Sequence, residues 1–477
     1  MSSRTTVAQA DENLPPSSVS ERVARGRAAR REAPRSSHGV FLPAPHRSDP
    51  LELLQQQDGS RDSRLVPIRY GRMLASPFTF FRGAALIMAA DLAATPRSGF
   101  LAQCCGDAHL SNFGMYASPE RRLVFDINDF DETLPGPWEW DVKRLAASVL
   151  VAARNSEFSP KAQEQAVLDT VGEYRARMRQ FAAMRNLDVW YTTFELDELL
   201  PELRSQVNAE MRRRLDRAMG KAMGRDSMHA FSKLTEEIDG EPRFVSAPPL
   251  IVPLDEVGEP EARERLRADL DRLLVAYRET LQHDRRAVLD QFRLVEIAHK
   301  VVGVGSVGAG AWIALLLGRD GQDPLILQMK EAQRSVLEEF AGASRYRNSG
   351  ERVVAGQRIM QASSDIFLGW LEVAQSIEGS TRDYYVRQLR DWKGSAVVEA
   401  MNPRALGVYG GLCAATLAHA HARSGDRIAI ASYLGSSDVF DRAILAFSEA
   451  YAEQNDQDYA SLAAAVASGR VEAAQGI

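Results

Sequence analysis

The residues best suited to chemistry lie between positions 101 and 145, where acids, an amide and an imidazole follow short apolar runs. Asp107 stands in a loop with His109 and, five residues after the aspartate, Asn112. An apolar, strand-like segment at 123–125 then leads into four acids: Asp126, Asp129, Asp131 and Glu132. Carboxylates this close raise one another's pKa unless cations neutralise them, and hard oxygen ligands suit Mg²⁺ better than zinc. The pattern therefore predicts a magnesium site.

Phosphoryl transfer requires such a set of groups. One aspartate orients the attacking hydroxyl, while an asparagine and a second aspartate hold Mg²⁺ on the nucleotide phosphates. We therefore expect Asp107, with His109 beside it, to be catalytic, and Asn112 and Asp129 to bind the metal. Two acids compete for the second ligand position: Asp126 and Asp131. The alternative is a loop whose Asp and Asn cap turns and whose acids form a solvated face.

A second motif follows about two hundred residues later in a segment of apolar runs and glycine-rich turns, which favours a small antiparallel sheet. Its glycines are Gly303, Gly305 and Gly308. Glycines let the backbone close over phosphates, and Lys330, at the end of the next expected strand, would pair with their charge. A Rossmann phosphate loop has the same spacing, with an acid such as Glu331 ending the next strand. We favour the kinase interpretation, because a Rossmann site gives no role to Asp107, Asn112 or Asp129.

These residues carry a resemblance. Gly106-Asp107-x-His109-x-x-Asn112, followed by Asn128-Asp129-Phe130-Asp131, resembles the catalytic loop and metal-binding segment of the aminoglycoside phosphotransferase and choline kinase branch of the protein-kinase-like superfamily. Pro137-x-x-x-Asp141-x-x-x-Leu145-Ala146 is similar to the helix start that comes next in those kinases. One departure is Cys105, where that branch usually has His, so the scaffolding hydrogen bond of that His is not carried over.

A closer resemblance is to the bacterial domain-of-unknown-function 2252 family. This resemblance extends over most of residues 50 to 460 and rests on four segments: GDAHLSNFG, FDINDFDETLPGPWEWDVKRLAAS, GVGSVG and LQMKEA. In an ordinary kinase the glycine loop and lysine precede the catalytic loop, whereas here they follow it. A circular permutation reconciles the two orders, because termini often lie near each other. It predicts that the end of a helix at 403–422 lies beside Cys105 and Asp107.

The resemblance implies an α+β fold: a bilobal, circularly permuted protein-kinase-like fold with a small antiparallel sheet lobe and a larger helical lobe. Residues 1–45, rich in Ser, Pro and Arg, are expected to be a disordered tail. Residues 46–240 would form the helical lobe with the catalytic loop and metal-binding segment, residues 241–395 the sheet lobe with the glycine loop and lysine, and residues 396–477 the helices that complete the helical lobe.

Smaller features add further expectations. Ser76-Pro77 indicates a helix start. Three arginines could bind phosphate or a substrate carboxylate, with surface ion pairs as the alternative: Arg69, Arg72 and Arg82. A helix after Lys330 would supply the glutamate that pairs with it, Glu338 or Glu339, with Glu351 as the rival. The segment 352–361 is expected to be a strand, as are 366–372 and 384–390.

Composition narrows the function. The chain has 477 residues, 45% of them hydrophobic, and a net charge of −6, so no global basic field favours nucleic acid. Three cysteines fit a reducing cytoplasm, and we expect neither a membrane span nor secretion, because no apolar run is long enough. We therefore expect a cytoplasmic phosphotransferase that takes ATP, Mg²⁺ and a hydroxyl-bearing small molecule. Nucleotidyl transfer to a protein, or an inactive nucleotide-binding regulatory module, are the alternatives; no oligomeric state is predicted.

Overall fold

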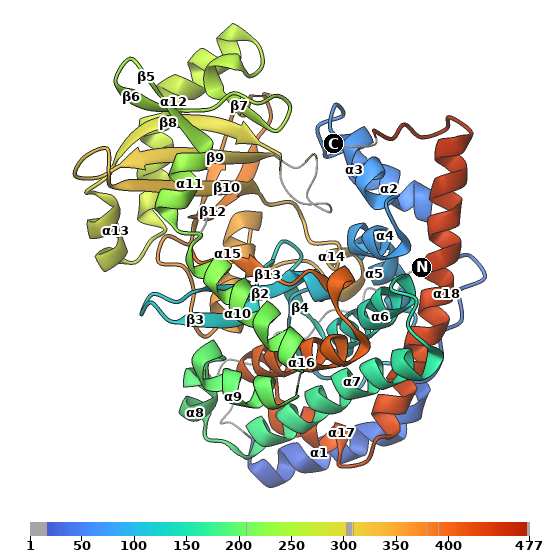
Figure 1. Ribbon diagram of the computed structural model, residues 1–477. Helices are drawn as coiled ribbons and strands as arrows, with labels where there is room; N and C mark the ends of the chain where they lie inside the picture. The colour runs from blue at the N-terminus through green and yellow to red at the C-terminus, as the bar shows by residue number, and fades with distance from the viewer. Residues whose placement is uncertain are drawn as a thin grey trace.

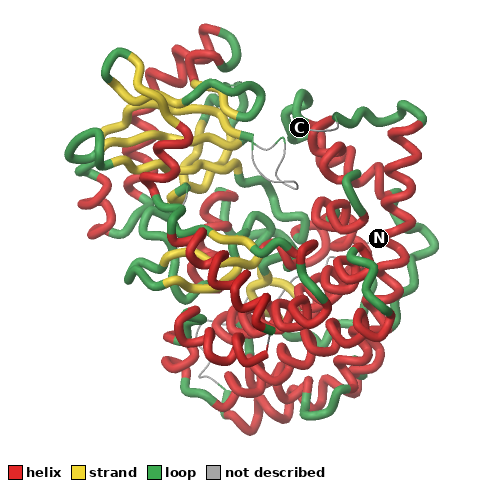
Figure 2. The backbone as a smooth tube through the Cα atoms, in the orientation of Figure 1, coloured by secondary structure: helices red, strands yellow, loops and turns green. Residues whose placement is uncertain are grey.

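The computed structural model describes residues 17–206, 208–301, 308, 310–377, 379–389 and 391–474. The fold is mixed α and β, and every strand pair of its small sheets is antiparallel (Figures 1 and 2). A six-stranded sheet stands at the upper left of Figure 1, and most of the helices form a larger body below and to its right. No helix among the described residues is long and apolar enough to cross a membrane.

The centre of the helical body is α6 (Trp138–Asn155), whose residues are buried from Trp138 to Ala153. A helix that is buried all round needs other helices on every side. Four of them pack against it: α4 (Pro77–Gly83), α7 (Pro160–Ala183), α16 (Pro403–Ser424) and α18 (Val439–Ala467). A further helix, α17 (Arg427–Leu434), packs on α7. Small residues let α16 approach closely, since a Cβ at Gly410 would lie 2.3 Å from the Thr170 hydroxyl of α7.

The expected disordered tail is wrong from residue 17 onward, where α1 (Val19–Glu32) packs against α17 (Figure 1). Ser18 caps this helix in a capping box with Glu21. Gly26 lies so close to α17 that a Cβ there would be 2.2 Å from the Ala429 carbonyl oxygen. Arg30 donates to the Tyr433 carbonyl at 2.8 Å. This helix gives no apolar signal in the sequence, because it docks through glycine and arginine and not through large apolar side chains. Residues 1–16 lie outside the described residues.

Four short helices continue the body: α2 (Pro50–Asp58), α3 (Val66–Met73), α4 (Pro77–Gly83) and α5 (Ala85–Ala93). The predicted helix start at Ser76 is confirmed. Its hydroxyl accepts the backbone N–H of Thr79 at 3.1 Å, and Pro77 occupies the first turn of α4. Along the chain, four more helices come between α7 and the six-stranded sheet: α8 (Asn186–Tyr191), α9 (Leu196–Gln206), α10 (Ala209–Met223) and α11 (Ser227–Leu234).

The six-stranded sheet has the order β11-β12-β10-β9-β8-β7. Its strands are β7 (Ile251–Pro253), β8 (Arg293–Lys300), β9 (Ala311–Leu317), β10 (Pro324–Glu331), β11 (Gly369–Val373) and β12 (Arg382–Gln388). The strand β9 is buried at every position because helices cover both faces. Ile313 and Leu315 pack with α11, whereas Trp312 and Leu316 face α12 (Pro260–Glu279).

The segment 352–361, expected to be a strand, is instead the helix α15 (Ser349–Met360), between β10 and β11. Asn348 caps it by accepting the backbone N–H of Glu351 at 2.9 Å. Its buried residues include Val353, Gln357 and Met360, a helical spacing that the adjacent valines obscured. The other two expected strands are present as β11 and β12 with shifted bounds.

Two small sheets join the six-stranded sheet to the helical body (Figure 2). One pairs β1 (Leu101–Cys104) with β4 (Leu134–Pro137), and the other has the order β13-β2-β3. The remaining elements are β2 (Phe113–Ala117), β3 (Leu123–Ile127), β5 (Thr235–Ile238), β6 (Glu241–Phe244), β13 (Gly394–Ser395), α13 (His283–Leu289), α14 (Glu338–Ala341) and four 3-10 helices, Arg35–Gly39, Leu110–Asn112, Leu254–Glu256 and Val398–Ala400. The loops at 105–109 and 128–133 leave these small sheets and carry the predicted site.

Candidate functional site

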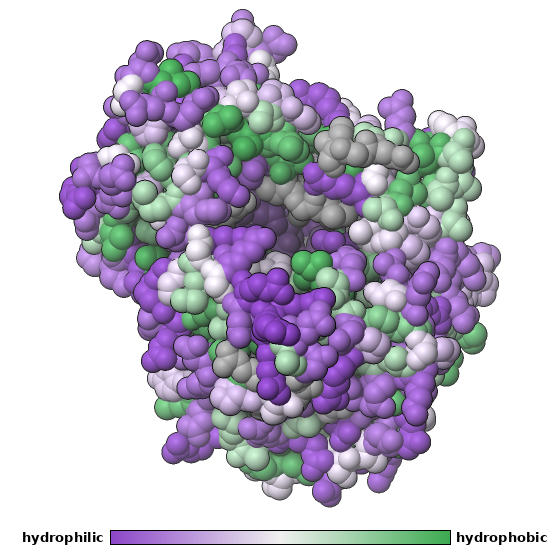
Figure 3. Space-filling model, in the orientation of Figure 1, coloured by the Kyte–Doolittle hydropathy of each residue, from purple (hydrophilic) through white to green (hydrophobic). Residues whose placement is uncertain are grey.

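A polar cleft of about 230 Å³ opens between the helical body and the six-stranded sheet. Figure 3 shows a hollowed, hydrophilic surface in this region. Three parts of the chain line it: α2 to α5, the two loops that leave the small sheets, and the end of β10. The lining residues include half of the predicted site: Asp107, His109, Asn112, Asp129 and Asp131.

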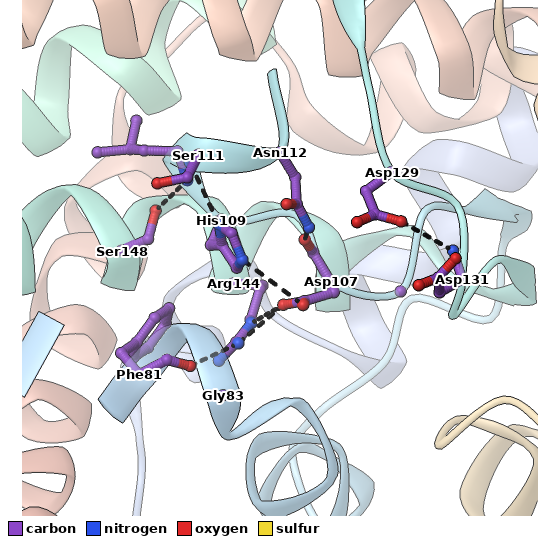
Figure 4. A network of polar contacts seen from close by, with 12 residues as sticks. Phe81, Gly83, Asp107, His109, Ser111, Asn112, Asp129, Asp131, Arg144 and Ser148 are labelled. Atoms are coloured by element: carbon purple, nitrogen blue, oxygen red, sulfur yellow. Dashed lines mark hydrogen bonds and ion pairs between the residues drawn. The ribbon is translucent and has the colours of Figure 1, made fainter. Parts of the chain in front are cut away.

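Asp107 is held in the cleft by Arg144 of α6 (Figure 4). The guanidinium meets Oδ1 of Asp107 twice, from Nε at 2.9 Å and Nη2 at 2.8 Å, and Nη2 also donates to the Phe81 carbonyl at 2.7 Å. Burial raises the pKa of Asp107, and Arg144 opposes that rise. The preceding Gly106 has a φ of +82° and leaves no room for a side chain, because a Cβ would lie 2.2 Å from the Glu132 carbonyl oxygen.

His109 is buried beside this carboxylate. Its Nδ1 accepts the backbone N–H of Ser111 at 3.2 Å, so the ring proton belongs on Nε2, which lies 3.6 Å from Oδ2 of Asp107 (Figure 4). Burial holds the pKa of His109 well below its usual range. The imidazole is therefore neutral and faces Asp107 with a donor, at a distance that would have to shorten to make a full hydrogen bond.

Asn112 joins the two loops. Its Nδ2 donates to the Asp107 carbonyl at 2.8 Å, so Oδ1 is the side-chain atom that a cation would bind. Its own carbonyl accepts the backbone N–H of Asn128 at 2.7 Å. The loop that carries Asp107 and the loop that carries Asp129 are thus fastened together through one residue.

Lys330 of β10 meets the acids of the second loop. Its Nζ lies 2.6 Å from Oδ2 of Asp131 and 3.5 Å from Oδ1 of Asp129, and the Tyr385 hydroxyl donates to the other oxygen of Asp131 at 2.7 Å. Burial alone would raise both pKa values, but Lys330 lowers the pKa of Asp131 to about 2. The pKa of Asp129 stays raised by burial and by the Asp131 charge. The sheet and the acidic loop therefore converge as expected.

Asp126 lies apart from this group and does not line the cleft. It sits inside β3, its Oδ1 accepts the backbone N–H of Ile127 at 2.8 Å, and its charged neighbourhood is Tyr116 and Arg423. Burial raises the pKa of Asp126 to about 7. The prediction that it competes for the metal is wrong, because the strand turns this side chain toward α16 before the loop reaches the cleft.

The glycine motif is described only at its end, since Gly303 and Gly305 lie outside the described residues. Gly308 has a φ of +86°, and its carbonyl accepts the backbone N–H of Asp62 at 2.8 Å. A Cβ on it would lie 3.0 Å from Cβ of Arg61, which lines the cleft. The end of the motif therefore lies at the rim of the same cleft.

The expected pairing of Lys330 with a helix glutamate is not made. Glu338 instead lies 3.3 Å from Arg334 and 4.0 Å from Arg352. The helix α15 contributes Arg352, which donates to the carbonyls of Thr133 and Asp131 at 2.6 and 2.8 Å and also to that of Gln333 at 2.8 Å. Sequence reasoning missed this arginine, because nothing in a lone Arg indicates that it is buried.

The end of α16 comes near the loop that carries Asp107, as predicted, and Asp141 of α6 bridges the two. Asp141 of α6 accepts the backbone N–H groups of Cys105 at 2.7 Å and Gly106 at 3.0 Å, and His421 Nε2 lies 3.2 Å from the same carboxylate. The Tyr174 hydroxyl and His421 Nδ1 are 2.8 Å apart. The loop is therefore anchored by Asp141 and α16, and not by a side chain at position 105.

A model of a family of uncharacterized proteins conserved in bacteria, DUF2252, matches residues 61–465. The chain belongs to this family. No curated protein and no solved structure matched the chain in the same comparisons. The match to DUF2252 covers Asp107, Asp129 and Lys330, whereas Gln57, which also lines the cleft, lies before it.

Two of the three candidate arginines in this DUF2252 protein are now placed. Arg69 is buried and bonded to Asp58 at 2.7 Å and to the side-chain oxygen of Gln57 at 2.8 Å, which makes it structural. Arg82 lines the cleft, and its Nε has no partner among the described residues. Burial lowers the pKa of Arg82, and the nearby Asp107 opposes this. Its guanidinium is the better candidate for an anionic ligand.

Proposed function

We propose that this protein is an ATP- and Mg²⁺-dependent phosphotransferase that acts on a hydroxyl-bearing small molecule. The observation that carries the proposal is the meeting of Lys330, from the sheet, with Asp129 and Asp131, in a cleft that also holds Asp107 and Asn112. A lysine, two carboxylates, an amide oxygen and a held aspartate are the parts that phosphoryl transfer uses.

The topology of the sheet supports a permuted kinase-like fold. Strands β8, β9, β10, β12 and β11 lie side by side in that order. The glycine motif joins β8 to β9, and Lys330 lies near the end of β10. Along the chain, α15 lies between β10 and β11. Kinases place their glycine loop, lysine and regulatory helix at these points. The placement of α16 beside the catalytic loop is the contact that the permutation requires.

The donor set fits a hard cation. Oxygen atoms of Asn112 and Asp129 would hold Mg²⁺, which prefers such ligands and keeps several waters. When bound, the metal neutralises charge on the nucleotide phosphates. Asp107, oriented by Arg144 and faced by His109, would accept or orient the proton of the acceptor hydroxyl. Lys330 would hold the phosphates, and Arg82 supplies positive charge on the Asp107 side of the cleft.

The decisive experiment uses ATP labelled on the γ-phosphate, with Mg²⁺ and a mixture of hydroxyl-bearing metabolites. Asp107→Asn should lower phosphoryl transfer by about a hundredfold or more, while nucleotide binding stays within a few-fold of wild type. Asp126→Asn is the matched control, because it alters a buried carboxylate outside the cleft. Equal activity in Asp107→Asn and wild type would refute the assignment of Asp107.

A parallel reaction with ATP labelled on the α-phosphate separates the alternatives. Label from the α-phosphate that stays on a protein indicates nucleotidyl transfer. Binding of ATP without release or transfer of either label indicates a regulatory module. The direct pairing of Lys330 with Asp131 favours the regulatory module if it persists when nucleotide is bound, because the lysine would then not reach the phosphates.

A further inference from the structure

A second polar cavity, here called the rear pocket, lies behind the cleft. It encloses about 270 Å³ among the β2–β3 hairpin, α13, α15 and the end of β12. Asn128 lines the rear pocket, whereas Asp129, the next residue, lines the cleft. The two cavities therefore lie on opposite sides of a single loop, and the rear pocket has no part in the proposed phosphoryl transfer.

The rear pocket carries an excess of positive charge. Four of its lining residues are basic: Arg121, Arg285, Arg387 and Lys393. Two lining residues are acidic, and Asp284, outside the lining, lies 3.3 Å from Arg285. Asp391 pairs with Arg121 at 2.6 Å. Asp365 accepts the backbone N–H groups of Phe367 at 2.8 Å and of Gln388, and burial raises its pKa.

One wall also presents a buried hydrogen-bond acceptor. Gln357 of α15 is 5% exposed, and its Oε1 has no partner among the described residues. Its orientation is fixed, because Nε2 donates to Oε1 of Gln361 at 2.9 Å, and Gln361 in turn donates to the Ile127 carbonyl at 2.6 Å. Reversing the Gln357 amide would set two oxygens against each other. An unmet buried acceptor is costly unless something donates to it.

Asn128 adds an unmet donor to the lining. Its Nδ2 lacks a partner among the described residues, although its carbonyl accepts Nη1 of Arg387 at 3.1 Å. Water could satisfy Gln357 and Asn128, but it would bring no negative charge to the basic side chains around them. The lining therefore offers basic side chains, one acceptor and one donor.

We propose that the rear pocket binds a small organic anion, a phosphorylated or carboxylated metabolite whose hydroxyl or amine donates to Gln357. The anionic group lies among the basic side chains, and the donor of the ligand faces α15. The basic side chains attract the anionic group, and the amides of Gln357 and Asn128 select a ligand that also carries a hydrogen-bond donor.

Isothermal titration of the full chain tests the proposal with three probes. Glycerol 3-phosphate, which has both an anionic group and hydroxyls, should bind with a Kd of about 1 mM or tighter. Glycerol should not bind, and sulfate, which has no donor, should bind about tenfold more weakly. Failure of glycerol 3-phosphate to bind, or equal binding of sulfate, overturns the proposal.

Variants locate the bound anion. Arg285→Gln and Gln357→Leu should each weaken glycerol 3-phosphate about tenfold, which corresponds to the loss of one charged or buried hydrogen-bond partner. Arg319→Gln, in an exposed turn between β9 and β10, should leave binding unchanged, and so should Arg82→Gln in the cleft. Binding that is lost in Arg82→Gln and kept in the two rear-pocket variants places the anion in the cleft and overturns the proposal. A melting curve for each variant confirms that it is folded.

Discussion

Asp129 and Asp131 are two positions apart but have different tasks. Both oxygens of Asp131 are engaged, one by Lys330 and one by the Tyr385 hydroxyl, and Lys330 keeps its pKa low. Asp129 has the longer contact to Lys330, its Oδ1 accepts the backbone N–H of Asp131 at 3.4 Å, and 32% of its side chain is exposed in the cleft. Asp129 is therefore the better ligand for a cation that enters from solvent, and Asp131 the residue that positions the lysine.

This division of tasks gives a prediction about metal dependence. Asp129→Asn should weaken Mg²⁺-dependent nucleotide binding about tenfold or more, because the metal loses a charged ligand. Calorimetric titration of nucleotide at several Mg²⁺ concentrations measures this effect. Asp126→Asn, which removes a buried carboxylate inside β3 and outside the cleft, should bind as the wild type does. If the metal dependence is unchanged in Asp129→Asn, Asp129 is not a ligand.

Lys143 gives a residue-scale prediction about stability. It is buried in α6, its Nζ has no hydrogen-bond partner among the described residues, and burial lowers its pKa to about 7 while Glu139 opposes this. In the unfolded chain the pKa of lysine is about 10.4. Between these two pKa values the unfolded chain binds more protons than the folded protein, so the free energy of unfolding rises with pH. Below this window the buried ammonium group of Lys143 destabilises the fold to its full extent.

Lys143→Met should therefore raise the free energy of unfolding by about 1–4 kcal/mol near pH 6.5 and by less near pH 9.5. Denaturant unfolding at both pH values measures the difference. Lys161→Met, an exposed position at the start of α7, should show no such pH dependence. A gain that is the same at both pH values would show that Lys143 keeps an ordinary pKa.

At the scale of elements, α15 holds the acidic loop in place through Arg352. Its three hydrogen bonds go to backbone carbonyls of the loop that carries Asp131 and of the segment that follows β10. Arg352→Met should lower the free energy of unfolding by about 2–4 kcal/mol, because it leaves buried carbonyls unmet. Denaturant unfolding measures the loss, and Arg345→Met, on an exposed position nearby, should change little.

Elements were predictable where their signals are local. The strands β8, β9 and β10 follow from apolar runs divided by glycine-rich turns, and α4 from Ser76-Pro77. The strand assignment for α15 failed because adjacent valines favour strands, while burial at 353, 357 and 360 is a tertiary outcome. The assignment of α1 failed because its partner, α17, lies about four hundred positions away.

The residues of the candidate site were also predictable only where their signals are local. Residue types and short spacings were enough to indicate Asp107, Asn112 and Asp129, because loops carry their chemistry in adjacent positions. Arg144 and Arg352, which hold those loops, gave no signal, since an arginine looks the same in a sequence whether it is buried or exposed. Two contacts were predicted across a long distance, that of Lys330 with the acidic loop and that of α16 with the loop that carries Asp107. The second came from the resemblance and not from the residues themselves.

At the scale of the whole molecule, α1 fastens the beginning of the described chain to its last helices. Gly26→Val should push α1 away from α17, since its side chain would overlap the Ala429 carbonyl. We expect a loss of about 1–3 kcal/mol in the free energy of unfolding and faster proteolysis at the arginines of α1. Thermal melting and limited trypsin digestion measure both effects. Arg27→Val, at the neighbouring exposed position, should leave α1 protected.

The link from Asp141 to His421, which are 280 positions apart, has a consequence for how this molecule is made. Residue 107 leaves the ribosome long before the helix that braces its loop. A nascent chain therefore carries this loop without its brace until residue 421 has been added. A messenger cut short before codon 421 would direct the synthesis of a protein in which the loop is never braced.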